Sequence, residues 1–218
     1  MTRQAPPSRY AGAPAAHTLP AGTVLSRVHQ VEYGATEFNP VGSDVLFGGG
    51  RFDSTKEDPY PYLYGADGDD AAVAETLLRD VDANDRGARF LPKTYWRNRQ
   101  LSRLRTTMPL PLITIRTGRD LGAIGQDTWL TTSNANDYPQ TRAWAHWLRE
   151  IDPNSCGLVW YSKREPATEA LVLFGDRCPP NAIEAADGPL LGACVFGKPD
   201  GYDRLKAILA NYRVSIRR

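Results

Sequence analysis

The chain has 218 residues, of which 41% are hydrophobic and 23% charged, and a formal net charge of +1. This length allows one sizeable core, and the near-neutral charge gives no reason to expect nucleic acid or a membrane surface as the main partner. No apolar signal segment opens the chain, and no later apolar run is long enough to cross a bilayer. Three widely spaced cysteines disfavour a disulfide framework or a zinc site, and three scattered histidines lack metal-ligand spacing. The sequence therefore predicts a cytoplasmic protein with reduced thiols and no metal.

The N-terminal segment differs in composition from the rest of the chain. Residues 1–22 are rich in Pro and Ala and have no hydrophobic periodicity, so we expect a mobile arm, with the folded domain at 23–218. A strand is predicted at 23–30, with Val24 and Val28 on one face and Leu25, Arg27 and His29 on the other. Arg27 lies on the face of this strand opposite to Val28, and it is therefore free to face a ligand.

The next stretch is the most informative, because an arginine, a tyrosine and a glutamate stand at the joints between predicted elements. Three glycines at 48–50 let the backbone approach a ligand closely, and Arg51 after them offers a planar donor fork suited to phosphate or carboxylate. Tyr64 ends a short predicted strand. A helix is predicted over 69–81, and Glu75 lies well off its apolar stripe. Glu75 is therefore free to point into a cleft.

A basic region follows at 82–107, with Tyr95 and Trp96 among its arginines. The part from 86 to 105 fits a nucleic-acid-binding surface, which defines a non-enzymatic alternative for this protein. A solvated and partly helical segment is the preferred interpretation, because the overall charge is nearly balanced. A nucleic-acid binding assay at several salt concentrations distinguishes the two interpretations. A nucleic-acid-binding surface predicts an affinity that falls steeply with salt, because it depends on neutralising phosphates.

The last part of the chain alternates apolar strands with helices. Thr141 lies near the start of one predicted helix, and Ser162 ends one predicted strand. Strands interspersed with only a few helices predict a single-domain α+β fold with a mixed sheet. The predicted strands lie at 111–116, 157–162, 170–174 and 193–196. The predicted helices lie at 139–151 and 203–212.

Taken together, these pieces resemble the RES-domain family, the NAD-degrading toxins of bacterial toxin–antitoxin pairs, whose core is similar to the ADP-ribosyltransferase fold of diphtheria toxin. The resemblance covers roughly residues 23–174, and 82–107 has no counterpart in the family pattern, which predicts an insertion there. Asp53 stands where the family more often has asparagine. The residues that carry the resemblance are Arg27, the turn Gly49-Gly50-Arg51-Phe52-Asp53, Tyr64, Glu75, the helix from Thr141 and the strand that bears Ser162.

The resemblance implies that the protein cleaves the bond between nicotinamide and ribose in NAD+, which is a substrate, with no cofactor. It implies a catalytic set of Glu75, Arg27 and Tyr64, in which Glu75 faces a ribosyl cation. It also implies substrate binding by Arg51, Ser162 and Thr141. The acceptor stays open: water gives a glycohydrolase, inorganic phosphate gives a phosphorylase, and a macromolecule gives an ADP-ribosyltransferase.

The resemblance also implies a protein partner. In the family this partner is a small antitoxin of the Xre helix-turn-helix type that blocks the cleft, so the chain is expected to meet DNA only through it. Other enzyme classes fail on motif spacing. The glycines at 48–50 lack the lysine and hydroxyl residues of a phosphate-binding P-loop, and Ser162 is not flanked by the glycines of a hydrolase nucleophile elbow.

Overall fold

Strand pairing determines the architecture of this protein, for which a computed structural model describes residues 5–79, 81, 89–186 and 194–217. Within these residues the main sheet has the order β1-β6-β7-β8-β3-β2-β5-β10, and β9 pairs with β5. Only β6 and β7 run parallel; the other pairs of this sheet are antiparallel. The strands are β1 (Ala16–Leu19), β2 (Val24–Gln30), β3 (Tyr62–Ala66), β5 (Arg99–Thr106), β6 (Leu110–Thr114), β7 (Gly157–Tyr161), β8 (Glu169–Phe174), β9 (Ile183–Ala185) and β10 (Cys194–Val195), with a separate parallel pair of β4 (Arg89–Phe90) and β11 (Val214–Ser215).

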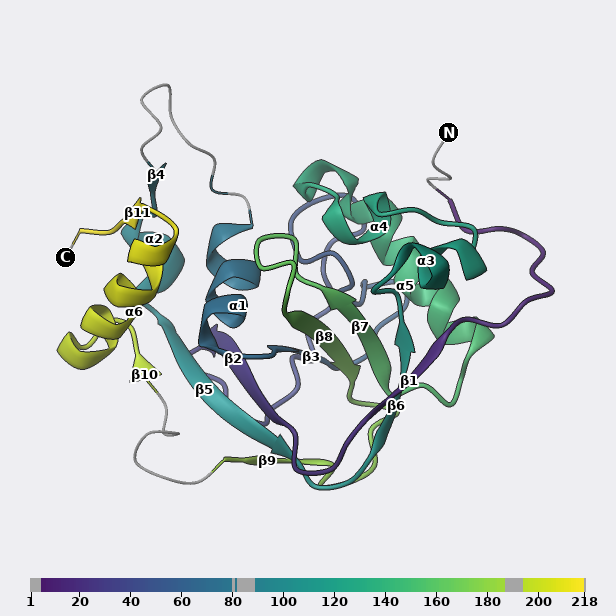
Figure 1. The fold of residues 1–218 in the computed structure, drawn as a ribbon, viewed down its shortest axis with the longest axis horizontal. Helices are drawn as coiled ribbons and strands as arrows, with labels where there is room; N and C mark the ends of the chain where they lie inside the picture. The colour runs from purple at the N-terminus through teal and green to yellow at the C-terminus, as the bar shows by residue number, and fades with distance from the viewer. Residues whose placement is uncertain (1–4, 80, 82–88, 187–193, 218) are drawn as a thin grey trace.

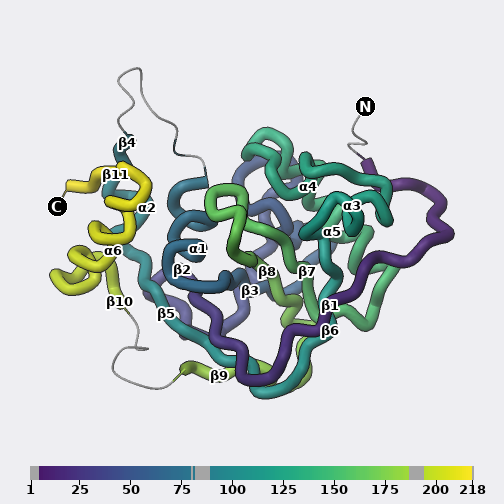
Figure 2. The backbone as a smooth tube through the Cα atoms, viewed as in Figure 1, coloured from purple at the N-terminus to yellow at the C-terminus, as the bar shows by residue number. Residues whose placement is uncertain are grey.

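Helices cover the sheet in separate groups. In Figure 1, α1 lies over β2 and β3, which it contacts, while α3, α4 and α5 gather beyond β6 and β7. Figure 2 places α2, α6 and β11 at one end of the molecule and the N-terminal segment before β1 at the other. The helices are α1 (Asp69–Val73), a π-helical turn (Ala74–Leu78), α2 (Lys93–Trp96), α3 (Gly118–Ala123), α4 (Trp129–Thr132), a 3₁₀ turn (Ala135–Asp137), α5 (Tyr138–Ile151) and α6 (Pro199–Asn211).

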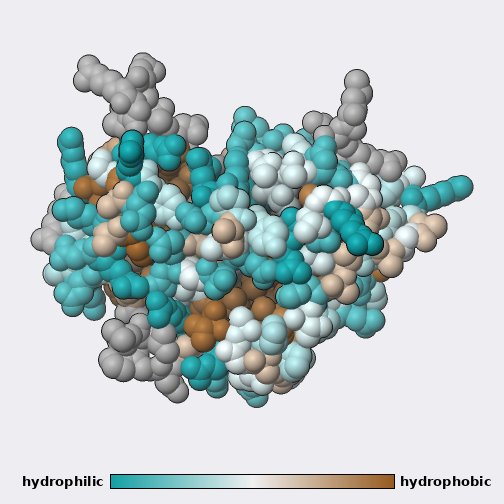
Figure 3. All heavy atoms as spheres, viewed as in Figure 1, coloured by the Kyte–Doolittle hydropathy of each residue, from teal (hydrophilic) through white to brown (hydrophobic). Residues whose placement is uncertain are grey.

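Both faces of the sheet are buried, which explains why its central strands are apolar runs without alternation. In β8, Val172 and Phe174 pack into the larger core cluster under the helices, whereas Leu171 and Leu173 pack into a second cluster on the other face. Side chains in a strand alternate between faces, so a strand between two cores needs apolar residues at every position. In Figure 3 an apolar area is visible between β5 and the β1–β6 edge, where the second cluster lies.

The prediction of a mobile arm over residues 1–22 is wrong for its last part. Ala16–Leu19 forms β1, which pairs with β6, and Leu19 is buried in the second core cluster. The alternating pattern of this strand is too short to be distinguished from a loop by periodicity. Tyr10 also contacts the domain, because its hydroxyl donates to the carbonyl of Ala123.

Part of the segment predicted to be an insertion, 82–107, forms β5, and its being an insertion relative to the family pattern stays a prediction. This strand lies inside the main sheet and pairs with all seven residues of β2. Leu101 and Leu104 belong to the two core clusters on opposite faces. The arginines of this strand interrupt its apolar pattern, so the sequence did not reveal a strand here. Two of them have places inside the fold, because Arg99 lines a cavity and Arg103 forms an ion pair with Asp69. Residues 82–88 lie outside the described part of the chain.

The other predicted elements are confirmed with shifted boundaries, and the α+β class with a mixed sheet is confirmed as well. The helix predicted at 139–151 is α5, and the one predicted at 203–212 is α6, which begins four residues earlier. The helix predicted over 69–81 is present, but it changes from α to π geometry after Val73.

Candidate active site

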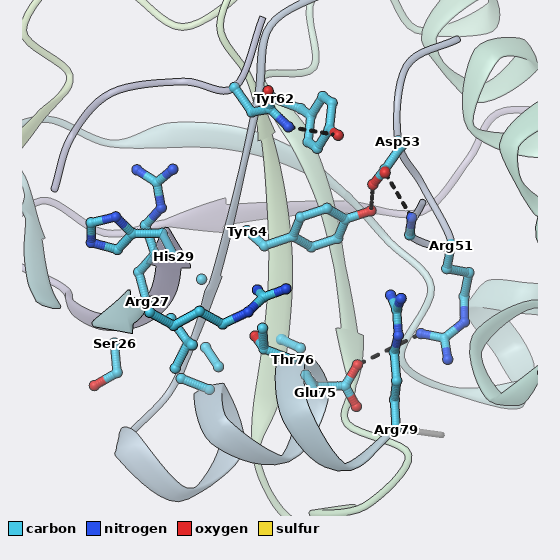
Figure 4. A pocket seen from close by; sticks show the side chains of 18 of the residues that line it. Ser26, Arg27, His29, Arg51, Asp53, Tyr62, Tyr64, Glu75, Thr76 and Arg79 are labelled. Carbon is cyan, nitrogen blue, oxygen red and sulfur yellow. Dashed lines mark hydrogen bonds and ion pairs between the residues drawn. The ribbon is translucent and has the colours of Figure 1, made fainter. Parts of the chain in front are cut away.

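A cavity of about 390 Å³ opens above the middle of the sheet. Its wall is formed by β2, β3, the helix that follows β3, the glycine-rich turn and the start of β5. Volumes of this size are typical of small-molecule sites. Four of the six residues predicted from the sequence line it, and they are Arg27, Arg51, Tyr64 and Glu75 (Figure 4).

Glu75 lies in the π-helical turn Ala74–Leu78. A π turn holds one more residue than an α turn, so it changes the direction in which the following side chains point, and such turns are frequent at functional sites. The apolar residues Val73 and Leu77 remain in the core on either side of it. Glu75 itself is 14% exposed and faces the cavity. The sequence predicted the direction of this side chain but not the π geometry.

The carboxylate of Glu75 is held on one side and open on the other. Its Oε1 accepts a hydrogen bond from Ser162 Oγ at 2.7 Å and another from the backbone N–H of Lys163 at 2.9 Å. Its Oε2 is 3.6 Å from Arg51 Nη1, which is an ion pair with room for further ligands (Figure 4). Two donors on one oxygen fix the orientation of the carboxylate before any substrate arrives.

Arg51 is 5% exposed and held by the segment that precedes α5. Its Nε donates to Ser133 Oγ at 3.3 Å and its Nη2 to the carbonyl of Ser133 at 3.4 Å. The ring of Tyr138 lies 5.8 Å from its guanidinium carbon. The backbone of Arg51 is fixed as well, because Thr141 Oγ1 donates to its carbonyl at 2.7 Å. Arg51 thus reaches Glu75 from the opposite wall of the cavity.

Tyr64 presents its ring to the cavity and uses its hydroxyl for the fold. The hydroxyl donates to Asp53 Oδ1 at 2.8 Å and accepts from the backbone N–H of Phe52 at 2.9 Å. Burial, and after it the negative charge of Asp53, raises the pKa of Tyr64 well above its ordinary value. Tyr64 therefore stays neutral and offers an aromatic surface, with Trp160 packed at an edge 6.3 Å away.

The glycine-rich turn is required by close approach. A Cβ on Gly50 would lie 2.5 Å from Asp53 Oδ1 and 3.0 Å from Tyr64 Oη, and Gly49 has a φ of +73°. Asp53, where the family pattern favours asparagine, accepts from the backbone N–H of Gly50 at 2.6 Å and from Ser43 Oγ at 2.7 Å. The turn is thereby closed around a carboxylate that points away from open solvent.

Two arginines that the sequence analysis missed support the same turn. Arg142 of α5 is almost fully buried and donates to the carbonyl of Gly48 at 2.7 Å and to that of Val45 at 3.2 Å. Arg79 lines the cavity and donates to the carbonyl of Gly49 at 2.9 Å. Arg142 stands next to the apolar stripe of α5, and this position in the sequence could have indicated that its side chain is buried.

Arg27 lines the cavity from β2 but is already bonded to the chain. It donates to the carbonyl of Ala35 at 2.6 Å, and burial, opposed by the charge of Glu37, lowers its pKa to about 10. Next to it, burial and then the charge of Arg27 lower the pKa of His29 to about 4. His29 Nε2 is 2.9 Å from Ser102 Oγ, so this histidine is a neutral group in the wall.

Ser162 and Thr141, both predicted to bind substrate, are buried and do not line the cavity. Their hydroxyls hold Glu75 and the backbone of Arg51 instead. Direct contact of either residue with a substrate stays a prediction. Among the described residues there is no group of three His, Cys, Asp or Glu side chains placed to hold a metal ion. No helix in the described part of the chain is long and apolar enough to span a bilayer.

Comparison with known proteins adds two findings. The family model of the RES domain matches residues 24–191 of the chain. A chain in the crystal structure of the M. tuberculosis MbcT-MbcA toxin–antitoxin complex is similar in fold, with a TM-score of 0.51, 15% sequence identity, and coverage of 78% of this chain and 84% of that one. At this identity the likeness concerns the fold alone. No curated protein matches the chain in sequence.

Proposed function

The chain belongs to the RES-domain family, and we propose that it is an NAD-degrading toxin that cleaves the nicotinamide–ribose bond of NAD+. The observation that carries this proposal is the fixed carboxylate of Glu75, which has one oxygen bound by Ser162 and Lys163 and the other open to a cavity. The bonding electrons leave with nicotinamide, so positive charge develops on the ribose carbon. A carboxylate held beside that carbon stabilises the transition state more than the substrate.

The rest of the site suits the other parts of a dinucleotide. Arg51 and Arg27 bring positive charge to the cavity wall, which favours binding of a pyrophosphate through charge-assisted hydrogen bonds. The ring of Tyr64 offers a surface for the nicotinamide ribose, and its hydroxyl is not needed for chemistry because it holds the turn at Asp53. Thr141 and Ser162 act through the residues that they position.

The acceptor is water or inorganic phosphate in this proposal. Water yields ADP-ribose, and phosphate yields ADP-ribose phosphate; either one attacks the ribose carbon and releases nicotinamide with the electrons of the broken bond. Transfer of ADP-ribose to a macromolecule is the alternative within the same chemistry, and it differs only in the attacking group.

We also propose a protein partner and a location. The similar fold in a toxin–antitoxin complex favours an antitoxin for this chain, and the family pattern favours the Xre helix-turn-helix type. The toxin then works in the cytoplasm, where NAD+ is abundant, and contacts DNA only through that partner. The non-catalytic alternative of a basic nucleic-acid surface at 86–105 has less support, because Arg99 lines the cavity and Arg103 is bonded to Asp69.

The test is incubation of the purified chain with NAD+, with and without inorganic phosphate, followed by mass spectrometry. We expect loss of NAD+, release of nicotinamide, and ADP-ribose or its phosphate as the second product. Glu75→Gln should lose most of its NAD+ turnover, whereas Glu150→Gln, on the exposed face of α5, should match the wild type. Unchanged NAD+ with the folded wild type under both conditions would reject the proposal, and label on a macromolecule would select the transferase alternative.

A further inference from the structure

Among the described residues, one cation that lines the cavity, Arg99, has no hydrogen-bond or ion-pair partner. Arg99, the first residue of β5, pairs in register with Gln30 of β2 and lines the cavity. No hydrogen bond or ion pair joins its side chain to any residue in the described part of the chain. The other arginines of the cavity differ, because Arg27, Arg51 and Arg79 donate to Ala35, Ser133 and Gly49, respectively.

The surroundings of Arg99 disfavour its positive charge. Burial and then the positive charge of Arg79 lower the pKa of Arg99, although a guanidinium keeps its proton at neutral pH. Within the described part of the chain, no carboxylate raises the pKa of Arg99 against these two effects. A partly buried cation beside a second cation destabilises a fold, and such arrangements are retained mainly where a ligand supplies the missing negative charge.

The position of Arg99 in the sheet separates it from the far wall of the cavity. That wall includes Ala170 of β8, and β8 is three strands away from β5 in the order β8-β3-β2-β5. Neighbouring strands lie about 4.8 Å apart, so the two backbones are roughly 14 Å apart along the sheet. The cavity thus has room for a ligand that extends from the Glu75 side towards β5.

We propose that Arg99, with Arg79 beside it, binds a phosphate group inside the cavity, in addition to the cation that Arg51 supplies. Two arginines suit this ligand because inorganic phosphate, or the two phosphates of a dinucleotide together, carries a charge that approaches −2 at neutral pH, and phosphate oxygens match a planar donor fork. The phosphate is either part of the substrate's pyrophosphate or free inorganic phosphate. The subsite rests on the proposed function only for which molecule supplies the phosphate.

Calorimetric titration with ADP and, separately, with inorganic phosphate at constant ionic strength tests the subsite. We expect Arg99→Gln to raise the dissociation constant of at least one of them by roughly ten- to a hundredfold. The control Arg97→Gln removes the same charge from an exposed side chain two residues away and should change it less than about twofold. An effect on ADP alone identifies the pyrophosphate, and an effect on inorganic phosphate identifies the free ion. Equal affinities in the wild type and Arg99→Gln, or no binding to the wild type, overturn the subsite.

Thermal unfolding in phosphate-free buffer separates binding from a structural role. Because Arg99→Gln removes an unpaired cation, its melting temperature should equal or exceed that of the wild type, whereas a structural arginine would give a lower one and overturn the subsite. Arg99→Lys keeps the charge without the donor fork and should bind with intermediate affinity. Neither titration requires cleavage. Arg99-dependent binding without NAD+ cleavage would therefore refute the proposed function alone, and cleavage with unaffected binding in Arg99→Gln would refute the subsite alone.

Discussion

Two carboxylates on one helical segment, Asp69 and Glu75, have different roles in this protein. Asp69 begins α1 and is 7% exposed, while Glu75 follows six residues later in the π turn. Asp69 accepts from Ser26 Oγ at 2.6 Å and from Arg103 Nη2 at 2.9 Å, and Arg204 bonds to it as well. Its negative charge is fully matched within the fold.

The electrostatics of Asp69 follow from these partners. Burial acts to raise its pKa, but hydrogen bonds from Arg103, Ser26 and Arg204 outweigh burial and lower the pKa to about 2. Asp69 thereby joins β2, β5 and α6 to the start of α1. Glu75, in contrast, has one arginine at 3.6 Å and an oxygen that faces a cavity. The difference teaches that a saturated carboxylate stabilises this fold, whereas a half-saturated one is available to a substrate.

The largest effect expected from this comparison is on turnover. Glu75→Gln keeps the acceptor for Ser162 and Lys163 but removes the charge, so we expect NAD+ turnover to fall by about 10² to 10³. The melting temperature should change by less than about 4 °C. Steady-state kinetics and thermal unfolding check both halves. Near-full turnover in Glu75→Gln, with cleavage otherwise established, would show that another carboxylate acts.

Asp69→Asn should have the opposite profile. We expect the free energy of unfolding to fall by about 2 kcal/mol, which lowers the melting temperature by about 4 to 8 °C, because the amide cannot match both arginines. NAD+ turnover by the folded variant should stay within a few fold of the wild type. Asp70→Asn is the matched control, since Asp70 has one amide partner, Asn211, at the surface. An inactive but stable Asp69→Asn protein would break the comparison.

Acid should remove the contribution of Asp69 in a defined range. Its pKa is about 2 in the folded protein and about 3.9 in the unfolded chain, so the stabilisation is fully present above pH 4 and is lost as the pH falls towards 2. The difference in unfolding free energy between the wild type and Asp69→Asn should therefore shrink from about 2 kcal/mol at pH 7 towards zero over that range. Urea unfolding at several pH values measures it, and a difference independent of pH would assign the effect to packing.

The smallest effect concerns the group that orients Glu75. Ser162→Ala removes one of the two donors to Oε1, and a hydrogen bond to a charged group of about 1.5 kcal/mol corresponds to about tenfold in rate. We expect kcat to fall by that factor while KM stays nearly constant, because Ser162 does not line the cavity. Ser162→Thr keeps the hydroxyl and should recover most of the rate. A rise in KM alone would instead assign Ser162 to direct substrate binding.

Much of the site was predictable from local pattern. The apolar stripe around Val73 and Leu77 left Glu75 off the core face, and the glycines before Arg51 indicated a close approach that Asp53 and Tyr64 explain. These inferences succeeded because helix periodicity and glycine geometry are properties of a few neighbouring residues.

Other features depended on residues distant in sequence. Nothing near Ser162 or Thr141 shows that their hydroxyls support Glu75 and Arg51, which are about 90 residues away in each case. The strand β5 was obscured by its arginines, since only the partners of Arg103 and the cavity at Arg99 explain why charged residues stand there.

The sequence by itself determined the α+β class, the two long helices, the apolar strands and the residues that identify the family, because each depends on short-range periodicity or composition. Only the tertiary structure decided which carboxylate is neutralised and which is left open. Asp69 and Glu75 are both acidic residues of one helix, and their roles diverge because β5 and α6 bring two arginines to the first, while the end of β7 brings a serine and a backbone N–H to the second. Electrostatic environment is a property of the assembled fold, so it cannot be read from the helix alone.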